Sequence, residues 1–278
     1  MESEEPHVVT CAQRLSAATV SQAVAYLDRS PYENVFLTYI ALEGGPLQRD
    51  VRIVWDGDDR VCGVGFFGRH VVLAGEDAAL PALAEAAAGL NENAVVGPQR
   101  TVNAYWQLIR SRHAPARLVR ERQPVMAVDA QSLRGANGAV SIRRARESEW
   151  AVIAENSAAM ISGEIEADAR LEMPQFGAGI RHMIRLGLWW VGECREGLCF
   201  FCNVGAWSPQ TAQLQGIWTP PRFRRRGIAT AALGAICRTL LCMVPSLSLY
   251  VNDFNAPAIA LYRGIGFREV GALQTMFF

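Results

Sequence analysis

The sequence has no lysine, no net charge and no long apolar stretch, and each absence excludes a class of protein. All 27 basic residues are arginines, and 27 acidic residues balance them. A net charge of zero argues against binding to nucleic acid or to a membrane surface through bulk charge. No stretch approaches the roughly 18 uninterrupted apolar residues of a spanning helix. We therefore expect neither nucleic acid nor a membrane as a partner.

The cysteine pattern predicts no metal site. There are seven cysteines, and only Cys199 and Cys202 form a C-x-x-C pair. Residues three apart on a strand point to opposite faces, and no second pair completes a zinc site. The acidic start, MESEE, is not followed by the apolar core of a secretory signal. These features predict a cytoplasmic protein with reduced cysteines, and they leave its oligomeric state open.

A basic segment near residue 220 is the most informative part of the chain. Residues 214–233 read LQGIWTPPRFRRRGIATAAL, in which an apolar run ends at two prolines and four arginines follow. Apolar residues spaced four apart then predict a helix: Ile228, Ala232, Ile236 and Leu240. The segment therefore predicts a strand, a basic loop and the start of a helix.

This arrangement suits a diphosphate. The first turn of a helix has backbone N–H groups without partners and a partial positive charge. Gly227 has no Cβ, so the backbone there can approach an anion closely. Arginine side chains add charge-assisted hydrogen bonds. A solvated basic turn before a surface helix is the alternative.

Two motifs resemble those of the GCN5-related N-acetyltransferase (GNAT) superfamily. RRRGIA, residues 224–229, is similar to its Arg/Gln-x-x-Gly-x-Gly/Ala signature, although Arg225 stands where many members have glycine. LYVNDFNAP (residues 249–257), ALY (260–262) and Gly266-Phe267 resemble its second motif. The resemblance implies an α/β (α+β) fold with a mixed, mostly antiparallel central sheet flanked by helices.

The resemblance also implies a function. It predicts an acetyl-CoA-dependent N-acetyltransferase that moves an acetyl group to a primary amine of a small molecule or peptide by direct attack. Acetyl-CoA is then the co-substrate, and the amine acceptor is unidentified. The residues that it implies for coenzyme binding are Ile217, Trp218, Thr219, Arg224, Arg225, Arg226, Gly227, Ile228, Ala229, Thr230, Asn255 and Tyr262.

Tyr262 matches the position of the family's proton donor, with a packed helix tyrosine as the alternative. Trp218 could equally be buried in the sheet, and Asn255 could be a helix N-cap. A general base is less evident. Glu164 lies where substrate-facing loops occur in the family, and Glu193 lies on a neighbouring strand.

Other functions stay open beside N-acetyl transfer. Gln213 and Gln215 on the central strand cannot take a proton, which favours a non-catalytic acyl-CoA-binding module as the alternative. A transferase of another acyl group is a further alternative. Trp189 and Trp190 point to opposite faces of a strand, so at most one can line an acceptor pocket.

The chain divides into two predicted domains, residues 1–134 and 139–278, joined by a polar, glycine-bearing linker. Both halves show the same order of predicted strands and helices, which suggests two GNAT-like domains in tandem. The whole chain resembles bacterial proteins in which a DUF4081 domain precedes a GNAT domain; PYENVFL (residues 31–37) and Gln123-Pro124 carry this likeness.

The first half lacks the basic loop. At the matching place stand residues 74–77, AGED, whose two carboxylates would repel a diphosphate. We therefore expect one coenzyme site per chain. We also expect a strand near residues 7–11, a helix over 148–161 with Glu164 in the following loop, and a pair of strands in 267–278.

Overall fold

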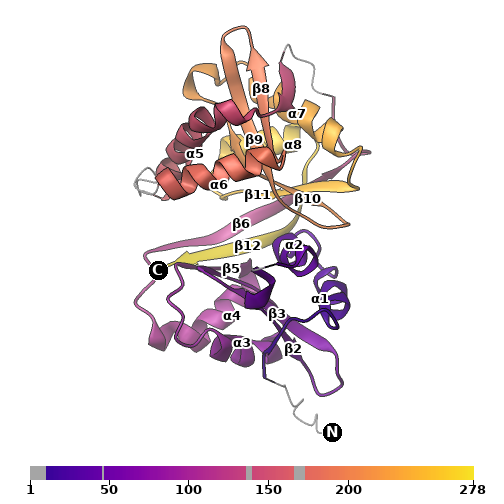
Figure 1. The fold of residues 1–278 in the computed structure, drawn as a ribbon, viewed down its shortest axis with the longest axis vertical. Helices are drawn as coiled ribbons and strands as arrows, with labels where there is room; N and C mark the ends of the chain where they lie inside the picture. The colour runs from indigo at the N-terminus through magenta and orange to yellow at the C-terminus, as the bar shows by residue number, and fades with distance from the viewer. Residues whose placement is uncertain (1–10, 46, 136–139, 166–172) are drawn as a thin grey trace. The chain divides into compact units, whose positions relative to one another are not determined.

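The structure is a computed structural model that describes residues 11–45, 47–135, 140–165 and 173–278 (Figure 1). Contacts divide it into two compact units. The first unit takes the chain up to Val125 together with Tyr250–Asn255 and Glu269–Phe278. The second unit consists of Met126–Leu249 and Ala256–Arg268. No helix among the described residues combines the length and the hydropathy needed to cross a membrane.

The first unit is a mixed sheet with helices on both faces. Its strands run in the order β1-β2-β3-β4-β5-β12, and neighbours are antiparallel except for the parallel pair β4–β5. Its elements are β1 (Gln13–Arg14), α1 (Val20–Leu27), α2 (Val35–Glu43), β2 (Val51–Trp55), β3 (Val61–Phe67), β4 (His70–Gly75), α3 (Leu80–Ala86), β5 (Ala94–Pro98), α4 (Gln99–Ile109), the start of β6 (Leu118–Asp129) and β12 (Arg268–Phe277).

Strand β3 shows why this sheet needs two helical layers. All seven of its residues are buried, because both of its faces are covered. Val64 packs in the core under α1 and α2, which also holds Leu27 and Ile40. Cys62 packs in the core under α3 and α4, which also holds Leu83. An all-apolar strand is typical of a sheet that is covered on both sides.

The second unit repeats the pattern. Its strands run β7-β8-β9-β10-β11, and neighbours are antiparallel except for the parallel pair β10–β11. Its elements are β7 (Ser141–Arg144), α5 (Trp150–Ile165), α6 (Met173–Arg185), β8 (Trp189–Cys194), β9 (Gly197–Trp207), β10 (Ala212–Trp218), α7 (Ile228–Leu240), β11 (Ser246–Tyr250) and α8 (Ala256–Gly264).

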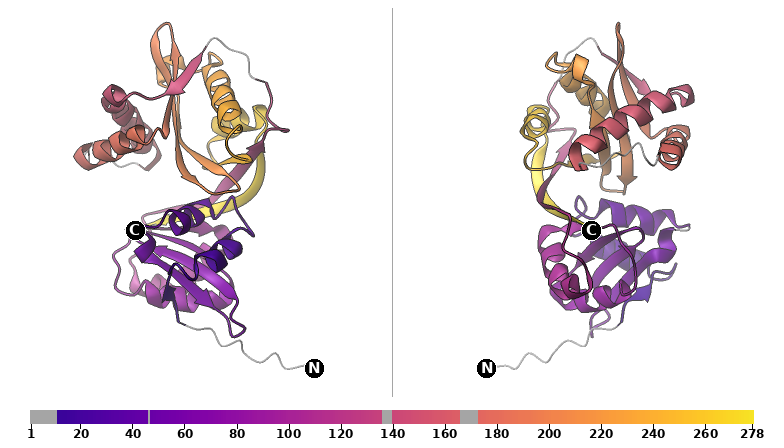
Figure 2. Two further views of the ribbon diagram at one scale, coloured as in Figure 1. Left: turned by 45° about the vertical axis from the view of Figure 1, so that its right-hand side comes forward. Right: turned by 90° about the vertical axis from the view of Figure 1, so that its left-hand side faces the viewer.

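Helices cover both faces of this sheet as well. Figure 2 shows α5 and α6 on one side of β8–β10 and α7 on the other. Ile153 of α5 and Ile180 of α6 pack with Trp189, Val191 and Phe201. On the opposite face, a Cβ added to Gly192 would lie 3.3 Å from Cβ of Ala232 in α7. The predicted mixed, mostly antiparallel sheet with flanking helices is confirmed.

Two local predictions are corrected, and a third is mostly untested. The final residues form the single strand β12, not a pair of strands. Helix α5 continues to Ile165, so Glu164 lies in its last turn and not in a loop. Most of the strand predicted near residues 7–11 falls outside the described residues, and residue 11 is in no strand.

Strand β12 belongs to the first unit although it ends the chain. Its residues 273–277 pair with 94–98 of β5. Thr275 Oγ1 donates to Gln123 Oε1 at 2.6 Å, and Gln123 Nε2 donates to Asn252 Oδ1 at 3.0 Å. Glu33 Oε1 accepts the N–H of Ala272 at 3.0 Å. The contacts thus divide the chain at several points, whereas the predicted domains meet at one linker.

Candidate active site

Strand β10 carries one extra residue near its end. Gln215 pairs with Asn203 and Trp218 with Phe201, so three steps along β10 match two along β9. Gly216 adopts a φ of +60° within this bulge. A Cβ there would lie 2.7 Å from Nδ2 of Asn203, which a larger residue could not tolerate. Because a bulge interrupts the ladder, it leaves backbone groups of β10 available to a ligand.

The edge of β10 that faces β11 is also open. The two strands pair only at Ala212 with Leu247 and at Gln213 with Ser248, although β10 continues to Trp218. The remaining N–H and C=O groups on this edge need partners. An extended chain that carries amides can pair with them as an added strand would. The predicted residues 217–219 lie at the end of this edge.

The basic loop, residues 222–227, is anchored by packing. Phe223 is fully buried in the short turn Pro221–Phe223. The guanidinium of Arg224 lies 4.5 Å from the centroid of the Trp218 ring, and its Nε donates to the Thr219 carbonyl at 2.9 Å. The Arg222 guanidinium lies 4.6 Å from the Phe223 centroid. Two cations are therefore held at the end of β10.

Two residues of the loop have left-handed backbones. Arg225 has a φ of +61° and Gly227 a φ of +74°. A non-glycine residue in this conformation costs roughly 1–2 kcal/mol, which explains why glycine suits the Arg225 position. Gly227 is the N-cap of α7, and no side chain of a described residue caps the helix. Arg225, Arg226 and Gly227 are exposed, so the first turn of α7 is open to an anion.

One arginine of the loop already has a carboxylate partner. Arg226 Nη1 donates to Glu196 Oε2 at 3.1 Å, from the turn between β8 and β9. The hydrogen bond from Arg226 lowers the pKa of Glu196. Both side chains are about half exposed, at 46% and 55%. The carboxylate therefore occupies a position from which an incoming phosphate could displace it.

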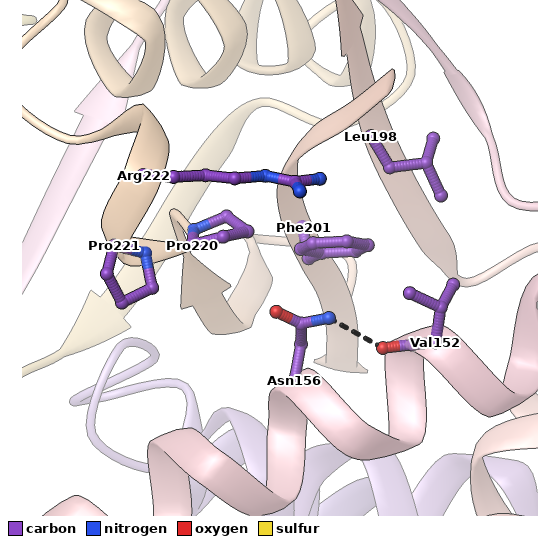
Figure 3. A pocket seen from close by; sticks show the side chains of 7 residues that line it. All are labelled: Val152, Asn156, Leu198, Phe201, Pro220, Pro221 and Arg222. Carbon is purple, nitrogen blue, oxygen red and sulfur yellow. Dashed lines mark hydrogen bonds between the residues drawn. The ribbon is translucent and has the colours of Figure 1, made fainter. Parts of the chain in front are cut away.

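A cavity of about 580 Å³ lies beside the end of β10 (Figure 3). Its lining is mostly apolar, from Val152, Asn156, Leu198, Phe201, Pro220, Pro221 and Arg222. In Figure 3, Asn156 and Val152 point from α5 toward Phe201. Asn156 Nδ2 donates to the Val152 carbonyl at 2.8 Å, and its Oδ1 accepts from Trp218 Nε1 at 3.3 Å. Asn156 thus fixes the indole against which Arg224 packs.

Tyr262 is almost fully buried, at 7% exposure, on α8. Its ring centroid lies 6.0 Å from that of Phe267, and its carbonyl accepts the Phe267 N–H at 3.0 Å. Helix α8 contacts α7. Asn255 lies in the loop before α8, where its N–H bonds to the Asn252 carbonyl at 2.9 Å, and contacts assign it to the first unit.

Neither predicted general base is seen at the bulge. The side chain of Glu164 is outside the described part of the structure, although its backbone is helical. Glu193 lies away from β10, because it is on β8 and β9 separates the two strands. Its Oε2 accepts from Arg143 Nε at 3.1 Å. Among the predicted site residues, the structure brings together 217–219 and 224–230.

Sequence reasoning missed two polar residues of this region. Asn156 was read only as part of a helix, and Asn203 only as part of an apolar strand. The signal for Asn203 was its polarity within FFCNVGAW, an otherwise apolar stretch. Asn203 is 6% exposed and faces the bulge. Asn156 gave no comparable signal, because an asparagine on a helix is ordinarily solvated.

The described residues contain no group of three or more histidine, cysteine, aspartate or glutamate side chains that could hold a metal ion. Cysteines can also act as nucleophiles, and all seven here are free thiols. Burial raises the pKa of the Cys199 and Cys237 thiols to about 12. These two thiols are poor nucleophiles, because the thiolate is the reactive form.

Strand β10, the basic loop and the uncapped start of α7 follow one another in the order that the GNAT resemblance predicts. The sequence comparisons agree. Residues 183–267 match the acetyltransferase (GNAT) family, and residues 53–153 match DUF4081, a domain of unknown function. The chain therefore carries a DUF4081 segment followed by a GNAT segment, which confirms the resemblance. No curated protein matches the chain.

Solved structures with similar folds cover nearly the whole chain. A Drosophila protein is 12% identical with a TM-score of 0.69, over 96% of this chain and 98% of its own. A tandem GNAT protein from the clavulanic acid biosynthesis pathway is 12% identical with a TM-score of 0.58, over 96% and 98%. A putative GNAT acetyltransferase from Novosphingobium aromaticivorans is 16% identical with a TM-score of 0.52, over 91% and 94%. At these identities the likeness shows a shared fold alone. The match of residues 183–267 to the acetyltransferase family is what supports acyl transfer in general.

Proposed function

We propose that this protein is an acetyl-CoA-dependent N-acetyltransferase that moves the acetyl group to a primary amine of a small molecule or peptide. The observation that carries the proposal is the succession of the bulged, open-edged strand β10, the basic loop and the uncapped start of α7. The seven free thiols agree with a cytoplasmic location.

In this proposal, the coenzyme lies along the open edge of β10. Its pyrophosphate binds the N–H groups at the start of α7 and the arginines of residues 224–226. The amides of its pantetheine arm pair with backbone groups of residues 217–219. The thioester carbonyl then reaches the bulge at Gly216, where N–H groups outside the ladder stabilise its developing negative charge.

The chemistry is a direct transfer. A neutral amine attacks the thioester carbonyl, the C–N bond forms, the C–S bond breaks, and the amine loses a proton. We assign to Tyr262 the protonation of the departing thiolate, because a tyrosine hydroxyl has an ordinary pKa near 10 and is protonated at neutral pH. We assign Glu164 as the base that takes the proton from the amine.

A non-catalytic acyl-CoA-binding module is the second candidate. It is favoured by the amides at the bulge, because Gln213 Oε1 accepts from Gln215 Nε2 at 2.7 Å and neither group takes a proton. Transfer of an acyl group other than acetyl is a variant of the first candidate. It uses the same coenzyme contacts.

The test combines binding and turnover. Calorimetry with acetyl-CoA measures whether the chain binds the coenzyme at all. A coenzyme-release assay against a panel of amines, peptides and aminoglycosides then measures transfer. Binding with turnover supports the transferase, and binding without turnover on any acceptor supports the module. Absence of acetyl-CoA binding would overturn both.

A further inference from the structure

A row of polar side chains crosses the face of the second unit that carries α5 and α6. Trp189 lies opposite Asn203, and Asn203 lies opposite Gln215. Directly opposite residues of antiparallel strands project from the same face. The carboxamide of Gln215 extends over Gly205, where an added Cβ would lie 2.3 Å from it. The row therefore runs from β8 across β9 to the bulge of β10.

Two atoms of this row have no hydrogen-bond partner among the described residues. They are Oδ1 of Asn203, an acceptor, and Nε1–H of Trp189, a donor. Their residues are 6% and 3% exposed. An unsatisfied buried polar group costs about 1–3 kcal/mol, and most such groups in folded proteins are paired. Both residues flank the bulge, because a Cβ at Gly216 would lie 2.7 Å from Nδ2 of Asn203 and 3.2 Å from Cη2 of Trp189. A ligand at the bulge is therefore a candidate partner for both atoms.

The two atoms lie on the face of the sheet opposite to α7. Helix α7 contacts β9 from the opposite face, so the proposed pyrophosphate site and the polar row lie on different faces of the sheet. An amine must attack a thioester carbonyl from above or below its plane. The coenzyme of the proposed function lies along the open edge of β10 with its pyrophosphate on the α7 side, and Asn203 and Trp189 flank the bulge on the side of α5 and α6.

Resting on the proposed function, we propose that Asn203 and Trp189 bind the acceptor and select its class. Asn203 Oδ1 accepts one N–H of the attacking amine and so directs the nitrogen lone pair toward the thioester. Trp189 Nε1–H donates to an oxygen that lies beside the amine in the acceptor. The acceptor is therefore a primary amine with a neighbouring hydroxyl or carbonyl oxygen, such as an amino alcohol or an amino amide.

The kinetic test compares ethanolamine with propylamine, which has the same number of heavy atoms and no oxygen. With rates expressed per unprotonated amine, we expect kcat/KM to be at least tenfold higher for ethanolamine. Trp189→Phe removes the donor and is expected to reduce this preference to within twofold. Asn203→Leu is expected to lower kcat/KM for both amines at least tenfold, and Asn203→Asp, which keeps an acceptor oxygen, to retain it within tenfold of wild type.

Two controls keep the readout specific. Trp190→Phe changes the neighbouring tryptophan, which projects from the opposite face, and is expected to keep the ethanolamine preference. The KM for acetyl-CoA is expected to stay within threefold in every variant. An unchanged preference in Trp189→Phe, or an equal loss in Trp190→Phe, would overturn the assignment of Trp189. An unchanged kcat/KM in Asn203→Leu would overturn that of Asn203.

A spectroscopic arm does not need turnover. The chain has seven tryptophans, so the indole N–H region of an NMR spectrum holds seven signals, and the one missing in Trp189→Phe belongs to Trp189. With coenzyme A bound, ethanolamine is expected to shift this signal and propylamine to leave it in place. Equal responses, or none, would overturn the proposal. Failure of the proposed function is distinct, because acetyl-CoA would then give no heat in calorimetry.

Discussion

The two units have the same strand pattern but opposite chemistry at one turn. In each, the first strand of a parallel pair leads through a turn into a helix: β4 into α3, and β10 into α7. After β4 the turn carries Glu76 and Asp77, and after β10 it carries the basic loop. Helix α7 has 13 residues, whereas α3 has seven. The same position in the two folds is therefore acidic in one unit and basic in the other.

The acidic turn satisfies its own charges. Arg60 donates two hydrogen bonds of 3.0 Å to the two carboxylate oxygens of Glu76. Arg100 Nη2 donates to Asp77 Oδ2 at 3.0 Å. These carboxylates take the arginines that a phosphate would otherwise use. The comparison shows that the same turn of the two sheets carries paired carboxylates in one unit and exposed arginines in the other.

The largest expected effect is the loss of kcat when the buried tyrosine of the second unit, Tyr262, is replaced, compared with replacement of a buried tyrosine in the first unit. Tyr262→Phe keeps the ring and deletes the proposed proton donor, and positioned donors typically contribute 10²–10⁴-fold to rate. We expect kcat to fall about 100-fold, with acetyl-CoA affinity within a few-fold of wild type. Tyr105→Phe is the matched control, because Tyr105 is fully buried in the first unit. Steady-state kinetics measure kcat for both variants and for wild type. A Tyr262→Phe variant with the kcat of wild type would assign Tyr262 to packing alone.

The next effect concerns the backbone of the basic loop. Proline cannot adopt the φ of +74° at Gly227 and has no N–H. We expect Gly227→Pro to weaken acetyl-CoA binding at least tenfold, about 1.4 kcal/mol. Gly89 has a φ of +84° with open space around its Cα, as Gly227 has, so Gly89→Pro is the control in the first unit. Calorimetry that finds Gly227→Pro equal to wild type would contradict the loop assignment.

A smaller effect is expected from the ion pair that holds Arg226. Glu196→Gln removes the carboxylate that competes with phosphate, while exposed pairs contribute only about 0–1 kcal/mol. We expect acetyl-CoA to bind about threefold more tightly, with a gain that shrinks as salt screens the charges. Glu76→Gln, the counterpart in the acidic turn, is expected to change nothing. Measuring the acetyl-CoA affinity of both variants at several salt concentrations tests these expectations. Weaker binding in Glu196→Gln would instead assign to Glu196 a role in holding the loop.

The smallest expected effect is none. The double variant Glu76→Gln, Asp77→Asn removes both carboxylates from the acidic turn. Glu76 has a φ of −72°, so the turn still lacks the left-handed residue that opens the start of α7. We expect acetyl-CoA to saturate at one equivalent per chain in wild type and in this variant. If the variant alone bound a second equivalent of acetyl-CoA, the two carboxylates alone would be what prevents binding to the first unit. If wild type bound a second equivalent, the prediction of one coenzyme site per chain would be refuted.

Much of the fold could be predicted because its signals are local. The apolar residues spaced four apart in α7, and the glycine before it, lie within or next to the helix that they define. Strand β12 was misread as two strands because its partner β5 lies about 180 residues earlier, and pairing at that separation leaves no local pattern. The left-handed Arg225 was equally hidden, since only the folded loop imposes that backbone. The polarity of Asn203 within an apolar stretch is a signal in the sequence, but its place beside the bulge and its missing partner are visible only in the fold.

The place of β12 also sets an order of events during synthesis. The first unit lacks a strand until the last ten residues, Glu269–Phe278, have left the ribosome. At about 5–20 residues per second, the 153 residues from Val125 to Phe278 (278 − 125) take roughly 8–31 s to make. During that interval β5 has an unpaired edge, of the kind that other chains can join. The sheet of the first unit is therefore completed only after the second unit has been synthesised.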